Sequence, residues 1–217
     1  MSTAPVGGSW SRLRRLASPT PWQTGPIVQR VYSSDGSFAD RPGGEWQFHA
    51  YHNHFHYTGF ALSRLWTVDA NGKTGAAPVR SRRHRLGQIG QLSGTARKVS
   101  FCVVDIEIDA WDQRALAPRR YSAQDCLAPG ADGYMVQGLA PGWADVYDWY
   151  LPDQYLDVYG LPDGQYLLET VADPDNTLLE SDETNNCGAV YVRLSDMTTA
   201  HPRATLVGPA PKCASTK

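Results

Sequence analysis

The chain has 217 residues, with 20 Lys and Arg against 22 Asp and Glu, so its formal net charge is -2. Its length fits one domain with or without tails, and its nearly balanced charge does not indicate a nucleic acid or an acidic membrane as partner. No apolar run approaches the roughly 20 residues of a membrane span. The 20 Gly, 15 Pro and 11% aromatic residues favour a loop-rich β protein over a helical one.

The first 25 residues are rich in Ser, Pro, Gly and Arg. We expect a flexible or truncated N-terminal segment at residues 1–25, followed by a single domain at residues 26–217. Residues 12–16 fit either a strand or a basic tail. The opening residues lack the apolar centre of a signal peptide.

Short runs of β-branched and aromatic residues alternate with turn signals along the rest of the chain. Extended segments are predicted, in chain order, at residues 25–32, 45–56, 60–68, 97–105, 142–150, 154–158, 165–171 and 189–194. Turns are predicted at residues 33–37, 69–72 and 162–164, an irregular stretch at residues 106–135, and a Pro-rich tail after the last strand. This pattern predicts an all-β fold of β-sandwich type, with long irregular loops and little helix.

A run of basic residues occupies positions 80–85. Such a run is either a solvated loop or a docking site for an acidic partner.

Four of the six histidines fall within residues 49–56, and three of them alternate as His52, His54 and His56. On one extended strand these three side chains would share a face, while His49 would face the other side. The alternative is a row of half-buried polar residues, each of which would then need its own hydrogen-bond partner. Imidazole clusters suit copper or zinc, and the ligand type and affinity order favour copper. The outer histidines are about 13 Å apart along a strand, so one ion requires them to lean inward or the strand to bend.

The four cysteines permit two disulfides in three connectivities, and none lies in a C-x-x-C pair. If they are oxidised, the protein belongs to an oxidising compartment.

Four motifs together resemble the catalytic domain of the lysyl oxidase family, in the family's order and at compatible spacing. The motifs are His49-x-x-His52-x-His54-x-His56, Lys98-Val-Ser-Phe-Cys102, Gln137-Gly-Leu-x-Pro-Gly142 with Asp145-x-Tyr147, and Glu180-Ser-Asp182-x-Thr-Asn185-Asn186. The resemblance runs from about residue 45 to residue 213. It implies a copper amine oxidase with a quinone made from its own side chains.

The resemblance also implies roles for individual residues. His52, His54 and His56 match the copper ligands, and His49 matches a histidine beside the metal that does not bind it directly. Lys98 and Tyr147 match the residues that form lysine tyrosylquinone. Without the resemblance, Lys98 reads as an ordinary surface lysine.

Asp145 is the candidate base, because on a strand it would share a face with Tyr147 and burial would raise its pKa. Tyr150 and Tyr155 are plausible core residues that only spacing separates from Tyr147.

The resemblance further implies disulfides Cys102–Cys126, or separate loops closed by these two residues, and Cys187–Cys213. The oxygen atoms of four residues in the acidic loop suit calcium, and the alternative is a polar turn that caps a strand. These residues are Glu180, Asp182, Asn185 and Asn186. An Asp-Leu pair that helps close this site in family domains has no counterpart here, so incomplete calcium coordination is the expectation.

The implied activity converts primary amines, including peptidyl lysine in a protein substrate, to aldehydes with molecular oxygen, releasing ammonia and hydrogen peroxide. The implied location is secreted or extracellular. Two other hypotheses fit the residues: a non-catalytic copper- or calcium-binding extracellular β-sandwich module, and a zinc hydrolase built on the three histidines.

Overall fold

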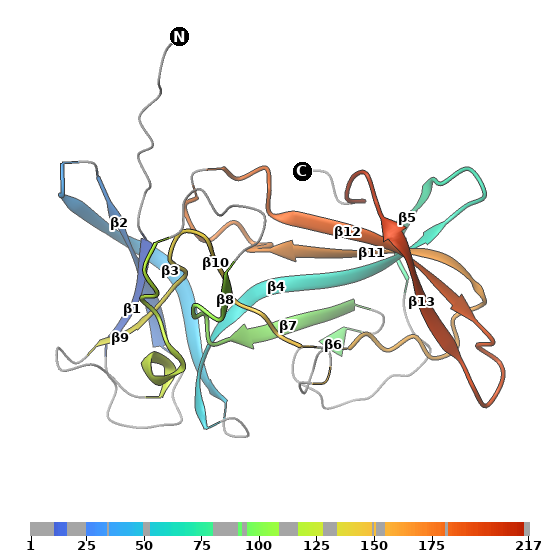
Figure 1. Ribbon diagram of the computed structural model, residues 1–217, viewed down its shortest axis with the longest axis horizontal. Coiled ribbons are helices and arrows are strands. Elements are labelled where there is room, and N and C mark those ends of the chain that lie inside the picture. Colours follow the sequence, from blue (N-terminus) through green and yellow to red (C-terminus); the bar gives the residue numbers. More distant parts are fainter. Residues whose placement is uncertain are drawn as a thin grey trace, which may run out of the picture. The chain divides into compact units, whose positions relative to one another are not determined.

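The structure is a computed structural model that consists mainly of antiparallel strands (Figure 1). It describes residues 11–16, 25–33, 35–49, 53–79, 91–92, 95–108, 117–127, 134–148, 150, 155–180 and 182–214. The helix in this part of the chain is one 3-10 turn, η2 (Ala123–Cys126), and no helix there is long and apolar enough to cross a membrane. The prediction of an all-β fold with irregular loops is confirmed.

The chain forms two compact units, each built from several segments. Unit 1 comprises Met1–Thr58, Ser100–Asp148 and Asn176–Glu183, and unit 2 comprises Gly59–Val99, Trp149–Asp175 and Thr184–Lys217. The long strand β4 (His54–Val68) contributes its first residues to unit 1 and the rest to unit 2.

Unit 1 contains an antiparallel ladder that follows the order β9-β1-β2-β3-β4. Its strands are β9 (Tyr134–Gln137), β1 (Ser11–Leu16), β2 (Gly25–Tyr32), β3 (Phe38–His49) and the start of β4. A separate small ladder pairs β8 (Glu107–Ile108) with β10 (Trp143–Ala144). The strand alternative for residues 12–16 is therefore the correct one.

The interior of unit 1 combines aromatic and sulfur-containing side chains. Trp46, Tyr57 and Met135 are almost fully buried. A cluster of Cys102, Val104, Tyr121 and Cys126 packs around the disulfide between Cys102 and Cys126. This disulfide is one of the two pairings implied by the resemblance, and it fixes the segment that follows β7 (Thr95–Phe101) to η2.

Unit 2 is built around the later part of β4, which pairs with β11, and the ladder continues through β12 to β13 (Figure 1). These strands span Gly164–Ala172 (β11), Cys187–Ser195 (β12) and Arg203–Pro209 (β13). Strands β5 (Thr74–Pro78) and β7 (Thr95–Phe101) also pair with β4, and β6 (Gln91–Leu92) pairs with β7. Leu65, Leu161, Tyr166 and Leu194 form its buried cluster.

Several predicted boundaries were wrong. The last strand was predicted to end at residue 194, but β13 follows in the Pro-rich tail and pairs with β12. Strand β9 begins inside the stretch predicted to be irregular, and β5 was not predicted. These strands have short or weakly apolar sequences, so backbone pairing with a neighbour, more than their own propensity, makes them extended.

The turn at residues 69–72 is confirmed, and its side-chain chemistry explains it. Asp69 Oδ1 accepts hydrogen bonds from the backbone N–H groups of Asn71 and Lys73, both at 2.9 Å. Gly72 has a φ of 78°, a conformation that glycine adopts without steric cost. The turn therefore closes β4 onto β5.

Candidate active site

The histidine-rich stretch forms a hairpin, so the prediction of one strand from residue 45 to residue 56 was wrong. Strand β3 ends at His49, β4 begins at His54, and these two residues are paired in the ladder. Asn53 precedes β4 with a φ of 55°, in the left-handed region that Asn tolerates. The turn breaks the alternation that the sequence suggested. His52 and the side chain of His49 lie outside the described residues.

His54 and His56 lie on the same face of β4, as the period of two predicts. Their Nε2 atoms are 2.7 Å apart and their ring centroids 4.6 Å apart, and His56 is only 2% exposed. The 2.7 Å separation is a hydrogen-bond distance, so the two imidazoles contact each other directly. Imidazole nitrogens that converge in this way are suitable ligands for copper or zinc.

Tyr147 is held by the backbone of Cys102. Its hydroxyl oxygen accepts a hydrogen bond from Cys102 N (3.0 Å) and donates one to Cys102 O (3.2 Å). Burial raises the pKa of Tyr147 well above its ordinary value, the nearby charge of Asp145 raises it further, and the backbone hydrogen bond offsets part of this. The phenol is therefore neutral at physiological pH.

Asp145 reaches Tyr147 by a route that differs from the predicted one. Strand β10 ends at Ala144, so residues 145–148 are not part of a strand, and the same-face argument for Asp145 and Tyr147 was wrong. The carboxylate nevertheless lies close enough to act on the pKa of Tyr147.

Gln137 connects the histidine strand to the segment that holds Tyr147. Its side chain is fully buried, Nε2 donates to the carbonyl of Phe55 (3.3 Å), and Oε1 accepts from Val103 N (3.0 Å). Phe55 lies between the two histidines, and Val103 follows Cys102 in the chain. Gln137 was predicted only as part of a motif. Its position at the end of a short apolar run could have indicated a buried polar side chain.

Asp105 is a second buried polar residue that the sequence analysis did not single out. Its side chain is 0% exposed and accepts three backbone hydrogen bonds, from Arg120 (2.8 Å), Tyr121 (3.0 Å) and Ala140 (2.7 Å). These three hydrogen bonds connect Asp105 to two other segments, so its carboxylate holds residues 120–121 and 140 against the loop that contains it.

The acidic loop is anchored by Gln29 on β2. The Gln29 amide donates to Leu179 O (2.9 Å) and accepts from Leu179 N (2.8 Å), directly before Glu180. Glu180 N donates to Glu183 Oε1 (3.0 Å), while Glu183 Oε2 is buried with no hydrogen-bond partner in the described part of the chain. A buried carboxylate oxygen of this kind is compatible with a cation beside the loop.

The Lys98 side chain and the basic run are two predicted features that lie outside the described residues. Lys98 lies on β7, and the basic run occupies residues 80–85. The pairing of Lys98 with Tyr147 therefore stays a prediction.

A model of the lysyl oxidase family matches residues 87–201, which is more than half of the chain. The chain belongs to the lysyl oxidase family. Human protein-lysine 6-oxidase is 28% identical over 160 residues, covering 73% of this chain and 31% of the relative. Pig protein-lysine 6-oxidase is 27% identical over 167 residues (76% and 54%), and human lysyl oxidase homolog 1 is 26% identical over 147 residues (68% and 20%). The chain thus matches between one fifth and about half of the length of these relatives.

The lysyl oxidase match covers the predicted quinone residues but not the histidines. Lys98, Asp145, Tyr147 and the acidic loop lie within residues 87–201, and residues 49–56 precede them. The metal-site prediction therefore depends on the histidine pattern and on the hairpin geometry of His54 and His56.

Proposed function

We propose that this lysyl oxidase family member is a copper-dependent amine oxidase that uses a lysine tyrosylquinone. It would convert primary amines, including lysine side chains in a protein substrate, to aldehydes with consumption of molecular oxygen and water and release of ammonia and hydrogen peroxide. The observation that carries this proposal is the convergence of the His54 and His56 Nε2 atoms at 2.7 Å on the strand that follows His52.

His52, His54 and His56 would hold the copper, and His49 would lie beside it without binding it directly. Copper with oxygen supplies the oxidising chemistry that converts a phenol to a quinone. The chain supplies the phenol of Tyr147 and the amine of Lys98, which would become bonded to the Tyr147 ring. The hydrogen bonds between Tyr147 and Cys102 support this role because they hold the ring in one orientation.

Asp145 would act as the base that removes a proton from the carbon next to the substrate amine. Its charge raises the pKa of Tyr147, and this electrostatic coupling supports the assignment. Gln137 would act as a positioning residue, since two of its hydrogen bonds link the histidine strand to the backbone beside Cys102.

We propose calcium as a second metal, bound by the acidic loop through Glu180, Asp182, Asn185 and Asn186. The oxygen-only donor set and the unpaired Glu183 Oε2 support a cation there. The two disulfides support a secreted or extracellular protein, because disulfides persist in oxidising compartments.

The decisive experiment starts with purified chain loaded with copper in the presence of oxygen. The proposal predicts quinone absorbance, peroxide release from a primary amine, and a peptide in which Lys98 is cross-linked to Tyr147 in mass spectrometry. Tyr147→Phe and Lys98→Arg should abolish all three signals. Tyr155→Phe is the matched control, because Tyr155 is a tyrosine eight residues further along the chain that is 49% exposed, and it should retain them.

A non-catalytic copper- or calcium-binding module predicts a different outcome. Copper would bind stoichiometrically, no quinone would form, and Lys98→Arg would leave every property unchanged. Zinc in place of copper after mild purification, with hydrolase activity, would replace the proposal with a zinc enzyme.

A further inference from the structure

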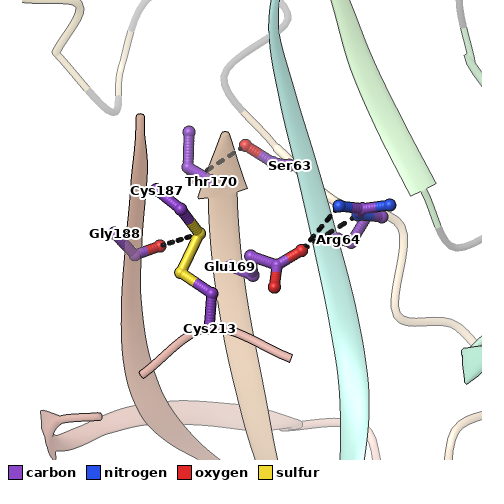
Figure 2. Close-up of polar contacts among 7 residues, drawn as sticks. All are labelled: Ser63, Arg64, Glu169, Thr170, Cys187, Gly188 and Cys213. Atoms are coloured by element: carbon purple, nitrogen blue, oxygen red, sulfur yellow. Dashed lines mark hydrogen bonds and ion pairs between the residues drawn. A yellow bond between two sulfur atoms is a disulfide. The ribbon is translucent and has the colours of Figure 1, made fainter. Parts of the chain in front are cut away.

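A buried carboxylate lies beside the second disulfide in unit 2. Glu169 on β11 is fully buried, and its carboxylate oxygen and the sulfur atoms of Cys187 and Cys213 lie within 4.8 Å of one another (Figure 2). The strand register explains this arrangement. Glu169 is paired with Ala189 on β12, and Cys187 is two residues from Ala189 on the same strand. Ala210 N donates a hydrogen bond to Ala189 O, so the C-terminal segment that contains Cys213 also lies beside this part of β12.

Arg64 holds Glu169 from the opposite side. Arg64 is paired with Glu169 in the β4–β11 ladder, and its Nη2 and Nε atoms lie 2.8 Å and 3.1 Å from Glu169 Oε1 (Figure 2). Arg64 and Glu169 form an ion pair that orients the carboxylate without any metal.

Reduction of the disulfide would change the charge balance at this place. A dithiol would transfer two electrons and two protons, becoming a disulfide itself, and so break the sulfur–sulfur bond to give two thiols. A phosphine would supply the two electrons and become a phosphine oxide, with water supplying the oxygen atom and the two protons. Loss of the two thiol protons would create two thiolates beside the carboxylate, and the negative charge of the carboxylate opposes this deprotonation. A divalent ion would make the sum of Arg64, Glu169 and two thiolates neutral.

We propose that Glu169, Cys187 and Cys213 form a zinc site that is closed while the disulfide exists and opens when it is reduced. Zinc takes thiolate sulfur at about 2.3 Å and carboxylate oxygen at about 2.0–2.2 Å, so neighbouring ligand atoms lie about 3.3–3.8 Å apart. The carboxylate oxygen and the two sulfur atoms now lie within 4.8 Å of one another. They would reach the spacing of zinc ligands if the two sulfur atoms moved apart and the carboxylate moved about 1 Å closer to them. The bound ion would replace the disulfide as the link between β12 and the C-terminal segment.

Exposure favours selective reduction of this disulfide. Cys187 and Cys213 are partly exposed, whereas Cys102 is 6% exposed and Cys126 is 0% exposed. Mild phosphine treatment of the full chain should therefore reduce Cys187–Cys213 first, and alkylation with mass mapping verifies which cysteines are free.

The test titrates the selectively reduced chain with Zn²⁺ and, as a spectroscopic probe, Co²⁺ under anaerobic conditions. We expect the reduced chain to bind one equivalent more than the oxidised chain, with thiolate-to-cobalt charge-transfer absorption in the near ultraviolet that the oxidised chain lacks. Cys187→Ser with Cys213→Ser is the matched control and should lose the absorption. Glu169→Gln should keep both thiols but weaken Zn²⁺ binding by at least tenfold.

A second measurement uses the unmodified sequence and does not depend on how the variants fold. Limited proteolysis should release the C-terminal segment from the reduced chain more quickly than from the oxidised chain, and one equivalent of Zn²⁺ should reverse this. Zn²⁺ binding equal in the wild type and the double serine variant would overturn the proposal, and so would unaltered affinity in Glu169→Gln. Failure of Zn²⁺ to protect the C-terminal segment would also overturn it.

Discussion

Replacing Asp105 with Asn tests whether one buried carboxylate holds the loops around Cys102. Its Oδ2 accepts from the backbone N–H groups of Arg120 and Tyr121, and its Oδ1 accepts from Ala140. An Asn side chain of the same shape offers one oxygen and one NH₂ group, so at least one backbone donor faces another donor. Each hydrogen bond to a charged group contributes about 1.5–3 kcal/mol, and an unpaired buried donor costs about 1–3 kcal/mol. We therefore expect the free energy of unfolding to fall by about 3–5 kcal/mol.

Equilibrium urea denaturation with both disulfides intact, followed by tryptophan fluorescence, measures this change. Asp163→Asn is the matched control, because the Asp163 carboxylate also accepts two backbone hydrogen bonds, from Asp196 N (3.1 Å) and Met197 N (2.9 Å), but is exposed. Water can replace those bonds, so the control should cost about 1 kcal/mol or less. Equal losses for the two variants would refute the argument that burial makes Asp105 important.

Three further predictions concern Gln137, Gly44 and Tyr147. Gln137→Leu should lower the free energy of unfolding by about 2–4 kcal/mol in urea denaturation, and copper titration should show about tenfold weaker binding, because the hydrogen bond from Gln137 to Phe55 O is lost. Unchanged copper affinity would limit Gln137 to a structural role. Gly44→Ala should cost about 1–3 kcal/mol in thermal unfolding, because the new Cβ would lie 2.8 Å from the Tyr57 hydroxyl at a φ of 106°, whereas Gly36→Ala has a positive φ but no atom within 4 Å and should cost less. The raised pKa of Tyr147 means that the native state keeps a proton that the unfolded state loses above about pH 10, so the contribution of this group to the free energy of unfolding is constant below pH 10 and falls above it. Tyr147→Phe should flatten this fall in denaturation curves measured from pH 8 to pH 11. Identical pH profiles for the two proteins would show that Tyr147 does not cause the fall.

The site was predicted unevenly from the sequence, for reasons that particular residues illustrate. The period of two correctly placed His54 and His56 on one face, because that relation depends only on extended backbone. It failed between His49 and His54, because a turn at Asn53 divides the stretch into two strands and alternation does not extend across a turn. The same limitation applies to Asp145, whose proximity to Tyr147 arises from a loop after β10.

The sequence by itself determined the all-β class and the family motifs, since these follow from composition and from residues close together in the chain. The disulfide pairings Cys102–Cys126 and Cys187–Cys213 were implied by the resemblance and are confirmed. Only the tertiary structure decided which distant residues meet: Gln137 with Phe55, Gln29 with Leu179, and Glu169 with Arg64. A buried polar side chain must find its partner wherever folding brings one, and that choice depends on strand register across more than 80 residues, which local sequence patterns do not contain.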